Sequence, residues 1–340
     1  MRAVAYSETG GTDVLRLVDR PVPRPLRGQV LVRVAASGLN PTDWKSRQGP
    51  RPGQALSSPF VVPHHDGAGT IVAVGSGVDP ARVGERAWIW EAAWGRADGT
   101  AQEFVALPET QAVPLPVTAS FDLGASLGVP ALTAHRCLTV GASRGTSLAA
   151  RPLEGSHVLV AGGAGAVGHM AVQLALWAGA SVIATVSSPA KAALARAAGA
   201  HHVIDYRSEH AARSILAVAP DGVDVVVEVN PVVNAPLDQA VLAHHGTIAS
   251  YASTPSNLCL DVTTFESKNA SHHFVMVFGV PGPAKALAIE DVCLALTAQV
   301  LGVGEECGLP VHRFPLEETA AAQAALEGGL VGKVLIDLAM

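Results

Sequence analysis

Short runs of apolar residues, several of them alternating with polar ones, fill the first third of the chain and predict β-strands. Four of these runs cover residues 29–36, 69–74, 85–89 and 103–106, and glycine and proline separate them. This texture predicts a β-rich domain over residues 1–124.

The pattern changes near residue 125, where runs typical of buried strands begin to alternate with alanine-rich segments of helical character. In chain order the strand-like runs are VLVAGG, SVIATVSS, HVIDY, VDVVVEVN, TIASYAS and HHFVMVFG. They divide into two successive β-α-β-α-β halves, which is the pattern of a doubly wound parallel sheet. We predict this α/β domain over residues 125–280.

Residues 281–340 contain an alanine- and leucine-rich helix, a strand near VHRFP, a second helix over residues 317–327 and a final strand, GKVLIDL. These strands need a sheet with which to pair. We therefore expect residues 281–340 to complete the first domain, so that the two ends of the chain build it together.

Composition narrows the class of protein. The chain has 340 residues, of which 49% are hydrophobic and 15% charged; an ordinary soluble protein has roughly 25% charged residues, and this balance excludes intrinsic disorder. The net charge is −6 and the 23 lysines and arginines are scattered, so the basic patch of a nucleic-acid-binding protein is missing. We expect a function on a small molecule.

One uncharged stretch, residues 157–187, is long enough to span a bilayer. Five glycines interrupt it where they would break a membrane helix, so strand, turn, helix and strand is the better interpretation. The N-terminal segment lacks the apolar core of a secretory signal, which favours a cytoplasmic location. The four cysteines lie far apart and lack zinc-ligand spacing, so neither a disulfide framework nor a structural zinc site is expected.

A glycine-rich turn joins the first strand of the α/β domain to its first helix. Gly163, Gly165 and Gly168 form a GxGxxG motif. The first glycine permits a tight turn, the second lets backbone N–H groups approach a pyrophosphate, and the third lets the helix pack on the strand. Ala166 and Val167 stand at the start of that helix, whose positive end attracts an anion. We predict a dinucleotide site; the alternative is a turn that binds nothing.

The end of the second strand distinguishes the two nicotinamide cofactors. An NAD site carries an acidic residue for the ribose 2′-OH about 20 residues after the last glycine. In that region this chain has Ser187, Ser188 and Lys191. Two hydroxyls and an ammonium suit a 2′-phosphate, so NADPH is the predicted cofactor. Alternatively, the serines cap the next helix and Lys191 is a surface residue.

With these motifs in place, the chain resembles the zinc-independent quinone oxidoreductases, the ζ-crystallin-like family of the medium-chain dehydrogenase/reductase superfamily, over almost its whole length. The matching blocks are GQVLVRVAASGLNPTDWKSRQG (28–49), HDGAGTIVAVGSGV (65–78), LGVPALTAHRCL (127–138), VLVAGGAGAVG (158–168), GAHHVIDYRSE (199–209) and VGKVLIDL (331–338).

The resemblance implies a GroES-like catalytic domain made of residues 1–124 and 281–340, with a Rossmann NADPH-binding domain over residues 125–280. It places the active site in the cleft between these domains. The reaction it implies is hydride transfer from NADPH to a quinone or an α,β-unsaturated carbonyl. In relatives the sixth Rossmann strand pairs with its counterpart in a second subunit, so a homodimer is implied too.

Zinc ligands are missing from the expected positions. The zinc alcohol dehydrogenases of the same superfamily have a catalytic cysteine where this chain has Asn40, a His-Glu pair where it has His65 and Asp66, and a second cysteine close to Pro130. Residues 90–102 contain no cysteine, so the structural zinc loop of that branch is missing as well. A tetrahedral zinc site cannot be built from what remains, and no metal is expected.

The resemblance also assigns site residues. Asn40 and Asp43 match an N-x-x-D at the nicotinamide end and are the candidate catalytic residues, the Asn40 amide as a donor to the oxygen that gains charge. The further residues assigned to NADPH binding are Thr133, Ser188, Lys191, Tyr206, Tyr251, Phe278, Gly279, Val280 and Lys333.

Two other functions stay open: a zinc-type alcohol dehydrogenase, and a non-catalytic NADPH-binding or structural protein. Some residues also have plain structural interpretations. The adjacent histidines, His64 and His65 among them, favour surface, turn or core-edge positions over metal binding, because neighbours on a strand point opposite ways. Asp66 is expected to cap a backbone rather than to act as an acid. The tryptophans that either line a substrate cleft or pack within the domain are Trp44, Trp88, Trp90 and Trp94.

Overall fold

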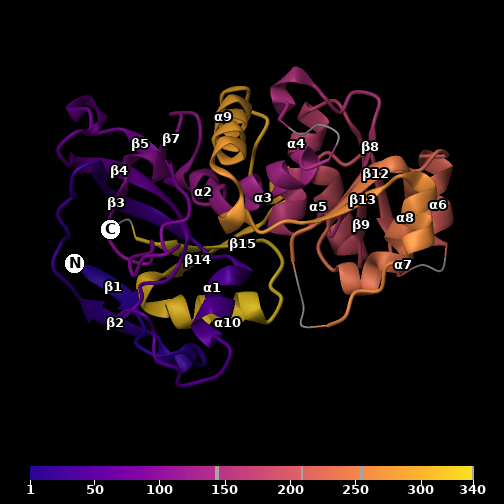
Figure 1. The fold of residues 1–340 in the computed structure, drawn as a ribbon. Helices are drawn as coiled ribbons and strands as arrows, with labels where there is room; N and C mark the ends of the chain where they lie inside the picture. Colours follow the sequence, from indigo (N-terminus) through magenta and orange to yellow (C-terminus); the bar gives the residue numbers. More distant parts are fainter. Residues whose placement is uncertain (142–144, 208–209, 253–255, 339–340) are drawn as a thin grey trace. The chain divides into compact units, whose positions relative to one another are not determined.

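The computed structural model describes residues 1–141, 145–207, 210–252 and 256–338 (Figure 1). The chain forms two compact units, one made of Met1–Val129 with Pro310–Met340 and the other of Pro130–Leu309. The division falls inside helix α3 (Gly128–Thr139).

The first unit is built on a seven-stranded sheet and a separate two-stranded sheet. Along the main sheet the strand order is β14-β15-β3-β4-β5-β7, and β6 also pairs with β3. All of these pairs are antiparallel except β14 with β15. The strands of this unit are β1 (Arg2–Ala5), β2 (Arg16–Asp19), β3 (Gln29–Gly38), β4 (Asp66–Val74), β5 (Arg86–Ile89), β6 (Phe104–Pro108), β7 (Ala112–Pro114), β14 (Val311–Pro315) and β15 (Lys333–Asp337).

Alternation along β3 builds the core of this unit. Val30, Val32 and Val34 recur at every second residue, so their side chains share one face of the strand. They are buried in a single cluster with Ile71 of β4 and Val334 of β15. The first and last parts of the chain therefore share one hydrophobic core.

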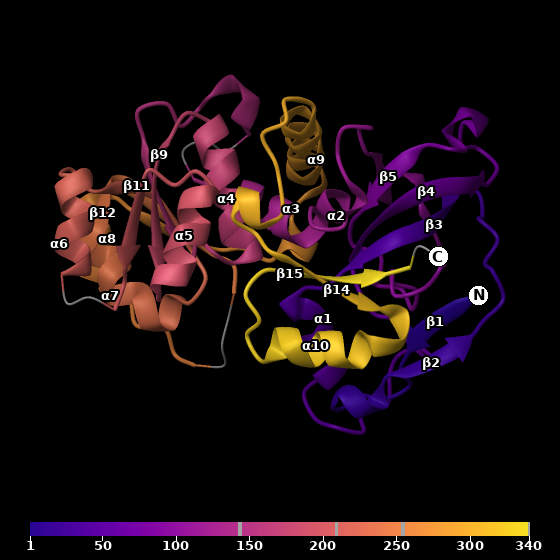
Figure 2. The same ribbon diagram turned by 180° about the vertical axis from the view of Figure 1, so that it is seen from behind.

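In the part of the first unit that the structure describes, the helices are α1 (Pro41–Gln48), α2 (Phe121–Gly124) and α10 (Thr319–Glu327), with the first residues of α3. α1 and α10 lie side by side (Figure 2). The fully buried Arg47 joins them, because its Nε donates to Gln323 Oε1 over 2.7 Å and its Nη1 to the Gly10 carbonyl over 2.6 Å. These contacts hold the end of α1 against α10.

The second unit has a six-stranded, wholly parallel sheet in the order β10-β9-β8-β11-β12-β13. Counted along the unit this is 3-2-1-4-5-6, the order of the doubly wound Rossmann fold. The predicted α/β fold is confirmed. The strands are β8 (His157–Ala161), β9 (Ser181–Val186), β10 (His202–Asp205), β11 (Val223–Glu228), β12 (Leu242–Ser250) and β13 (Ser271–Phe274).

Helices cover both faces of this parallel sheet (Figures 1 and 2). Leu159, Ile183, Val226 and Ile248, from four different strands, are buried in one cluster with Ile215 of α6. Because both faces are covered, the strands read as continuous apolar runs in the sequence. The helices of the unit are α4 (Ala166–Trp177), α5 (Pro189–Ala197), α6 (Ala211–Val218), α7 (Pro231–Val241), α8 (Val262–Lys268) and α9 (Gly282–Thr297), with most of α3.

The units do not divide at the predicted residues. Residues 281–309 belong to the second unit, not to the first. The reason is a buried carboxylate on α9: Asp291 Oδ2 lies 2.7 Å from His135 Nε2 of α3 and accepts from the Leu148 N–H over 2.8 Å. An alanine-rich helix pattern carries no sign of which sheet the helix packs against, so only residues 310–340 return to the first unit.

The sixth strand is shorter than its apolar run. β13 ends at Phe274, and Val277–Gly279 forms a 3₁₀ turn instead of continuing the strand over HHFVMVFG. The ladder with β12 ends where Phe274 pairs with Ser250. β12, in contrast, begins at Leu242, ahead of the TIASYAS run that predicted this strand.

Candidate active site

Three neighbouring strands bring a polar cluster together inside the first unit. In the sheet, Gly38 near the end of β3 pairs with Asp66 of β4 on one side and with Leu335 of β15 on the other. Asn40 follows two residues after Gly38, and Lys333 begins β15. The register therefore places Asn40, Asp66 and Lys333, which are far apart in sequence, at one point.

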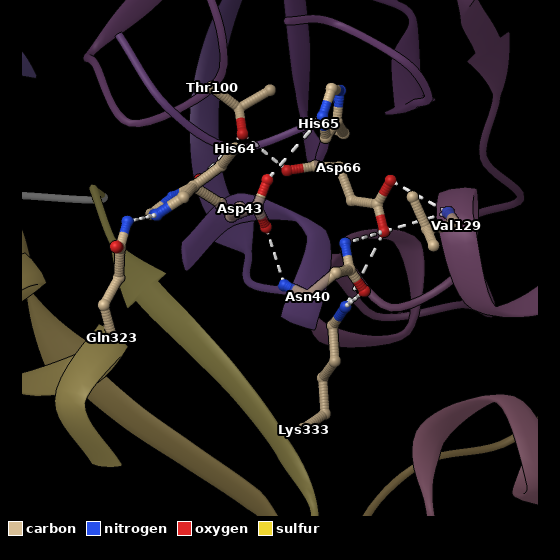
Figure 3. Close-up of polar contacts among 10 residues, drawn as sticks. Asn40, Asp43, His64, His65, Asp66, Thr100, Val129, Gln323 and Lys333 are labelled. Carbon is tan, nitrogen blue, oxygen red and sulfur yellow. Dashed lines mark hydrogen bonds and ion pairs between the residues drawn. The ribbon is translucent and has the colours of Figure 1, made fainter. Parts of the chain in front are cut away.

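Their side chains form a connected set (Figure 3). Lys333 Nζ donates to Asn40 Oδ1 over 3.0 Å and stands 3.7 Å from Asp66 Oδ2. The Asn40 Nδ2 donates to the same Asp66 oxygen over 2.7 Å. Both ends of the Asn40 amide are thus engaged, and its orientation is fixed.

Asp66 also caps the start of α3. The Val129 N–H donates to Asp66 Oδ1 over 2.9 Å and to Oδ2 over 3.0 Å. Gly128 leaves the room for this contact, because a Cβ at that position would stand 2.1 Å from Asp66 Oδ1. The prediction that Asp66 caps a backbone is confirmed, and the cap is combined with the contact to Asn40.

Asp43 lies at the third position of α1, where its carboxylate turns back on the helix start. Its Oδ2 accepts from the Asn40 N–H over 2.7 Å, one half of a capping box. Its Oδ1 lies 3.9 Å from His65 Nε2. Asn40 and Asp43, the two candidate catalytic residues, are therefore joined by a direct hydrogen bond.

The neighbouring His64 fixes the segment that leads into β4 through contacts of both its ring nitrogens. Its Nδ1 lies 2.9 Å from Ser37 Oγ and its Nε2 lies 3.2 Å from Gln323 Nε2. Ser37 Oγ in turn lies 2.7 Å from Thr100 Oγ1, which donates to the Asp66 carbonyl. His64 has a φ of 78°, in the left-handed region, and it lies outside the strand, two residues before β4 begins.

Burial governs the ionisation of the cluster. Asn40, Asp43, His64, His65, Asp66 and Lys333 are each at most 5% exposed. Burial raises the pKa of Asp43 to about 8 and raises that of Asp66 as well. Burial lowers the pKa of His64 to about 3, that of His65 to about 4, and that of Lys333 below its ordinary value.

A pocket of about 320 Å³ reaches this cluster within the first unit. Asp43, His64 and His65 contribute to its wall, and so do Trp94 and Arg96. Trp94 is 48% exposed, whereas Trp88 of β5 is fully buried. Of the tryptophans considered from the sequence, Trp94 lines a pocket and Trp88 packs within the domain.

In the second unit the glycine-rich motif forms the turn between β8 and α4. Gly165 is the residue before the helix, so the N–H groups of Ala166, Val167 and Gly168 lie in its first turn, where no intrahelical partner exists. At Gly168 a Cβ would stand 2.4 Å from the Gly162 carbonyl, so only glycine fits. The predicted close packing of the third glycine is confirmed.

The tight turn itself lies one residue earlier than expected. Gly162, with a φ of 69°, takes a left-handed conformation, whereas the tight turn was expected at Gly163. Gly163 is needed for another reason, since its Cβ would stand 2.8 Å from the Ala184 Cβ of β9. The Gly162-Gly163 doublet was the available signal.

The residues predicted to bind a 2′-phosphate lie together after β9. Ser188 Oγ accepts from the Lys191 N–H over 3.3 Å and caps α5, so the structural alternative for this serine holds. Lys191 Nζ donates to Ser187 Oγ over 3.2 Å. The Tyr206 N–H donates to the Val186 carbonyl over 3.2 Å, which places Tyr206 next to Ser187.

The remaining candidates of the second unit follow other strands of the same parallel sheet. Tyr251 comes directly after β12, and Phe278, Gly279 and Val280 follow β13 by a few residues. The carboxyl ends of parallel strands share one edge, so these residues lie along the same edge as the glycine-rich turn. Thr133 differs: it is a buried residue within α3.

Sequence reasoning underestimated His65 and did not single out Arg96, although both line the pocket. The HHDGAG motif was a signal for His65. From the sequence we considered only whether two adjacent histidines could bind one metal ion, so no other function was assigned to His65. For Arg96 the sequence offers no signal, because it stands in an irregular segment between β5 and β6.

Within residues 1–141, 145–207, 210–252 and 256–338, no helix has both the length and the apolar character needed to cross a bilayer. Within the same ranges, no group of three or more His, Cys, Asp and Glu residues is arranged to hold a metal ion.

Comparison with known proteins gives the family. Residues 26–117 match the alcohol dehydrogenase GroES-like domain, and residues 166–287 match the zinc-binding dehydrogenase family. The chain is 33% identical over 344 residues to the quinone oxidoreductase of Pongo abelii, which covers 99% of this chain and 97% of that protein. It is 36% identical over 235 residues to the chloroplastic NADPH-dependent alkenal/one oxidoreductase of Arabidopsis thaliana, covering 67% of this chain and 57% of that one.

Among solved structures, a mycobacterial protein in complex with NADPH matches with a TM-score of 0.80 and 28% identity over 99% of both chains. Likeness over the whole length, in sequence and in fold, agrees with the motifs on which the resemblance was based. The chain belongs to the quinone oxidoreductase family of the medium-chain dehydrogenase/reductase superfamily.

Proposed function

We propose that this protein is an NADPH-dependent oxidoreductase that reduces a quinone or an α,β-unsaturated carbonyl without zinc. The observation that carries the proposal is the buried contact of Lys333 with Asn40 and Asp66. This contact gives the first unit a fixed polar centre in which the cation is the Lys333 side chain rather than a bound metal ion. Relatives named for quinone reduction and for NADPH-dependent alkenal/one reduction support the acceptor class.

Zinc does not fit this centre. Asn40 offers a neutral amide where a zinc site needs a thiolate, imidazole or carboxylate, and its oxygen already accepts from Lys333. The Lys333 ammonium stands 3.7 Å from Asp66, so a second cation beside it would be repelled. These contacts support a reaction in which fixed hydrogen-bond donors, rather than a metal, stabilise the charge that develops on the acceptor.

NADPH fits the second unit. The N–H groups of Ala166, Val167 and Gly168 lie in the first turn of α4 and form an anion site at the start of this helix. They would hold the pyrophosphate. Ser187, Ser188, Lys191 and Tyr206 would hold the 2′-phosphate. Thr133, Tyr251, Phe278, Gly279, Val280 and Lys333 would make the family's other cofactor contacts. When bound, NADPH supplies the hydride.

In the first unit, we assign to Asn40 the stabilisation of the reacting oxygen. Its Nδ2 carries two N–H donors, of which one goes to Asp66. The other is assigned to the nicotinamide ribose or to the acceptor oxygen that gains negative charge. Lys333 and Asp66 act as positioning residues, since their contacts keep the Asn40 amide from rotating.

The proposal has a direct test. Purified protein is mixed with NADPH and a panel of quinones, enals, enones and simple ketones, and the loss of NADPH absorbance is followed before and after exhaustive chelation. Turnover of quinones or enones that survives chelation, without stoichiometric zinc in elemental analysis, is expected. Turnover of alcohols that requires zinc would establish the alcohol dehydrogenase instead. Stoichiometric NADPH binding without turnover of any acceptor would establish a non-catalytic protein.

Assembly and location belong to the same proposal. β13 is an edge strand of its sheet, and Phe274 (72% exposed) and Met276 (60%) leave apolar surface there, which supports a homodimer formed through this edge. Light scattering that gives one subunit's mass at micromolar concentration would contradict it. No disulfide joins the four cysteines, all of which lie in the described ranges, which is compatible with the reducing cytoplasm. Fractionation of cells tests the location.

A further inference from the structure

Two buried groups that face each other line the pocket of the first unit. Asp43 and His65 both line it, and its volume of about 320 Å³ lies in the range of small-molecule sites, ~300–1,000 Å³. Trp94 supplies an aromatic wall on which a flat ring can rest. The pocket therefore has the size and the lining for a conjugated acceptor, with a carboxyl and an imidazole in its wall.

The two carboxyl oxygens of Asp43 have different neighbours. Oδ2 accepts from the Asn40 N–H over 2.7 Å and holds the carboxyl in place. Oδ1 is turned to His65, whose Nε2 lies 3.9 Å away (Figure 3). Catalytic contacts are often longer in a ligand-free structure than in the reacting complex. A closure of about 1 Å would complete a hydrogen bond between the two groups.

Resting on the proposed function, we propose that Asp43 and His65 are the proton donor for a quinone or enone bound in this pocket. As the hydride adds two electrons to the acceptor, its carbonyl oxygen gains negative charge and takes the proton of Asp43 Oδ1, since Asp43 itself lines the pocket. The His65 Nε2–H then donates to the Asp43 oxygen that has lost its proton. Asp43 is left as a carboxylate and recovers its proton from water once the product has left. One hydride and one proton make the hydroquinone, or the enol that becomes the saturated ketone.

The surroundings keep one proton available on this pair near neutral pH. Burial raises the pKa of Asp43 to about 8 and lowers that of His65 to about 4, so the acid holds the proton and the ring is neutral. His65 stays neutral throughout the step, because an imidazolium is disfavoured in this buried place. The other titratable or charged groups around the pair and the pocket are Tyr6, Arg47, His64, Asp66, Arg96 and Lys333.

Substitutions separate this role from a structural one. Asp43→Asn keeps an oxygen for the Asn40 N–H but has no proton to give, and His65→Gln removes the ring. Each is expected to lower kcat with a quinone about 100-fold, the lower end of general acid catalysis, while the dissociation constant of NADPH changes less than twofold. His135→Gln is the matched control, since it breaks another buried His–Asp contact, to Asp291 in the second unit. It is expected to lower the melting temperature and leave kcat nearly unchanged.

Two further measurements do not depend on those variants. Added imidazole should restore activity to His65→Ala in a saturable way, which a packing defect would not allow. In the wild type, kcat should fall as the pH rises through about 8, where Asp43 loses its proton, with NADPH affinity unchanged. Full kcat in Asp43→Asn and His65→Gln, or a kcat that is flat to pH 10, would overturn the pair. A wild type that oxidises no NADPH with any quinone or enone would instead overturn the proposed function.

Discussion

Lys333 and Asn40, 293 positions apart in the chain, meet in a 3.0 Å hydrogen bond inside the first unit. The contact depends on both ends of the chain building one sheet, in which β15 and β4 flank β3. It fixes which end of the Asn40 amide is the acceptor: Oδ1 faces the ammonium and Nδ2 faces Asp66. The amide thus has one orientation before any ligand binds, as a preorganised donor requires.

Removal of Lys333 tests this arrangement. Lys333→Met leaves the buried Asp66 without its cation, and the free energy of unfolding should fall by about 3–5 kcal/mol at pH 8. The loss should be smaller at pH 5, because burial already raises the pKa of Asp66 and the lone carboxyl can then take up a proton. Urea unfolding at the two pH values measures both effects.

A double variant provides the control for Lys333. Asp66→Asn in the Lys333→Met background removes the stranded charge, so part of the lost stability should return. It keeps an oxygen that can accept from the Val129 N–H. If the double variant is no more stable than Lys333→Met at pH 8, the Lys333–Asp66 attraction does not stabilise the fold.

The sequence was sufficient for the parts of the fold that depend on local pattern. The apolar runs located the strands of the Rossmann sheet, and the GxGxxG motif located the turn before α4. The pattern could not tell that Phe274 ends its strand, because Val275 and Val277 are as apolar as a strand requires. It could not assign α9 either, since the decisive contact of Asp291 is with His135, 156 positions away.

The sequence could predict which residues belong to the candidate site, but not how they contact one another. The resemblance supplied Asn40, Asp43 and Lys333, and the structure brings these three into one cluster. The part played by His65 depends on a 3.9 Å approach to Asp43 and on a shared pocket, neither of which a motif encodes. Long-range register and irregular loops decide such contacts, and single-sequence patterns contain neither.

Lys191 tests the cofactor preference. Its Nζ lies 3.2 Å from Ser187 Oγ and would pair with a 2′-phosphate. Lys191→Ala should raise the dissociation constant of NADPH about tenfold, equivalent to ~1.4 kcal/mol, while that of NADH changes less than twofold. Arg196→Ala on the same helix removes an equal charge at the other end and should change neither. Equal weakening of both cofactors by Lys191→Ala would contradict the assignment.

Two glycines of the motif should respond differently to alanine. In Gly168→Ala the new Cβ would stand 2.4 Å from the Gly162 carbonyl, so stability should fall by about 1–3 kcal/mol. In Gly165→Ala the nearest atom is 3.4 Å away and the backbone, with a φ of −86°, is ordinary, so stability should change by less than about 0.5 kcal/mol.

NADPH binding separates these two variants further. Gly165→Ala should stay folded and still bind NADPH more weakly, because a methyl group would stand where the pyrophosphate approaches the backbone. Calorimetric titration and thermal unfolding on the same preparations measure both properties. An unchanged affinity in folded Gly165→Ala would show that this turn does not hold the pyrophosphate.

Asp291 should make the second unit sensitive to acid. Burial by itself raises the pKa of this carboxyl, but hydrogen bonds from His135, Ser147 and the Leu148 N–H outweigh burial and hold the pKa below its ordinary value of 3.8. A carboxyl whose pKa is depressed by folding stabilises the fold above its unfolded value, and the contribution is lost as the pH falls through the lower folded value. The wild type should therefore lose stability between pH 5 and pH 3 more steeply than Asp291→Asn.

At pH 7 we do not expect Asp291→Asn to be neutral for stability. Asp291→Asn loses charge-assisted hydrogen bonds in a buried place, so it should be less stable than the wild type by about 1–3 kcal/mol. Asp205 gives the contrast: its pKa is lowered to about 2 by Arg207, but both groups are exposed, and solvent screens such a pair. Asp205→Asn should therefore change stability far less. Parallel acid dependence in Asp291→Asn and the wild type would show that the contact between α9 and α3 carries no titrating charge.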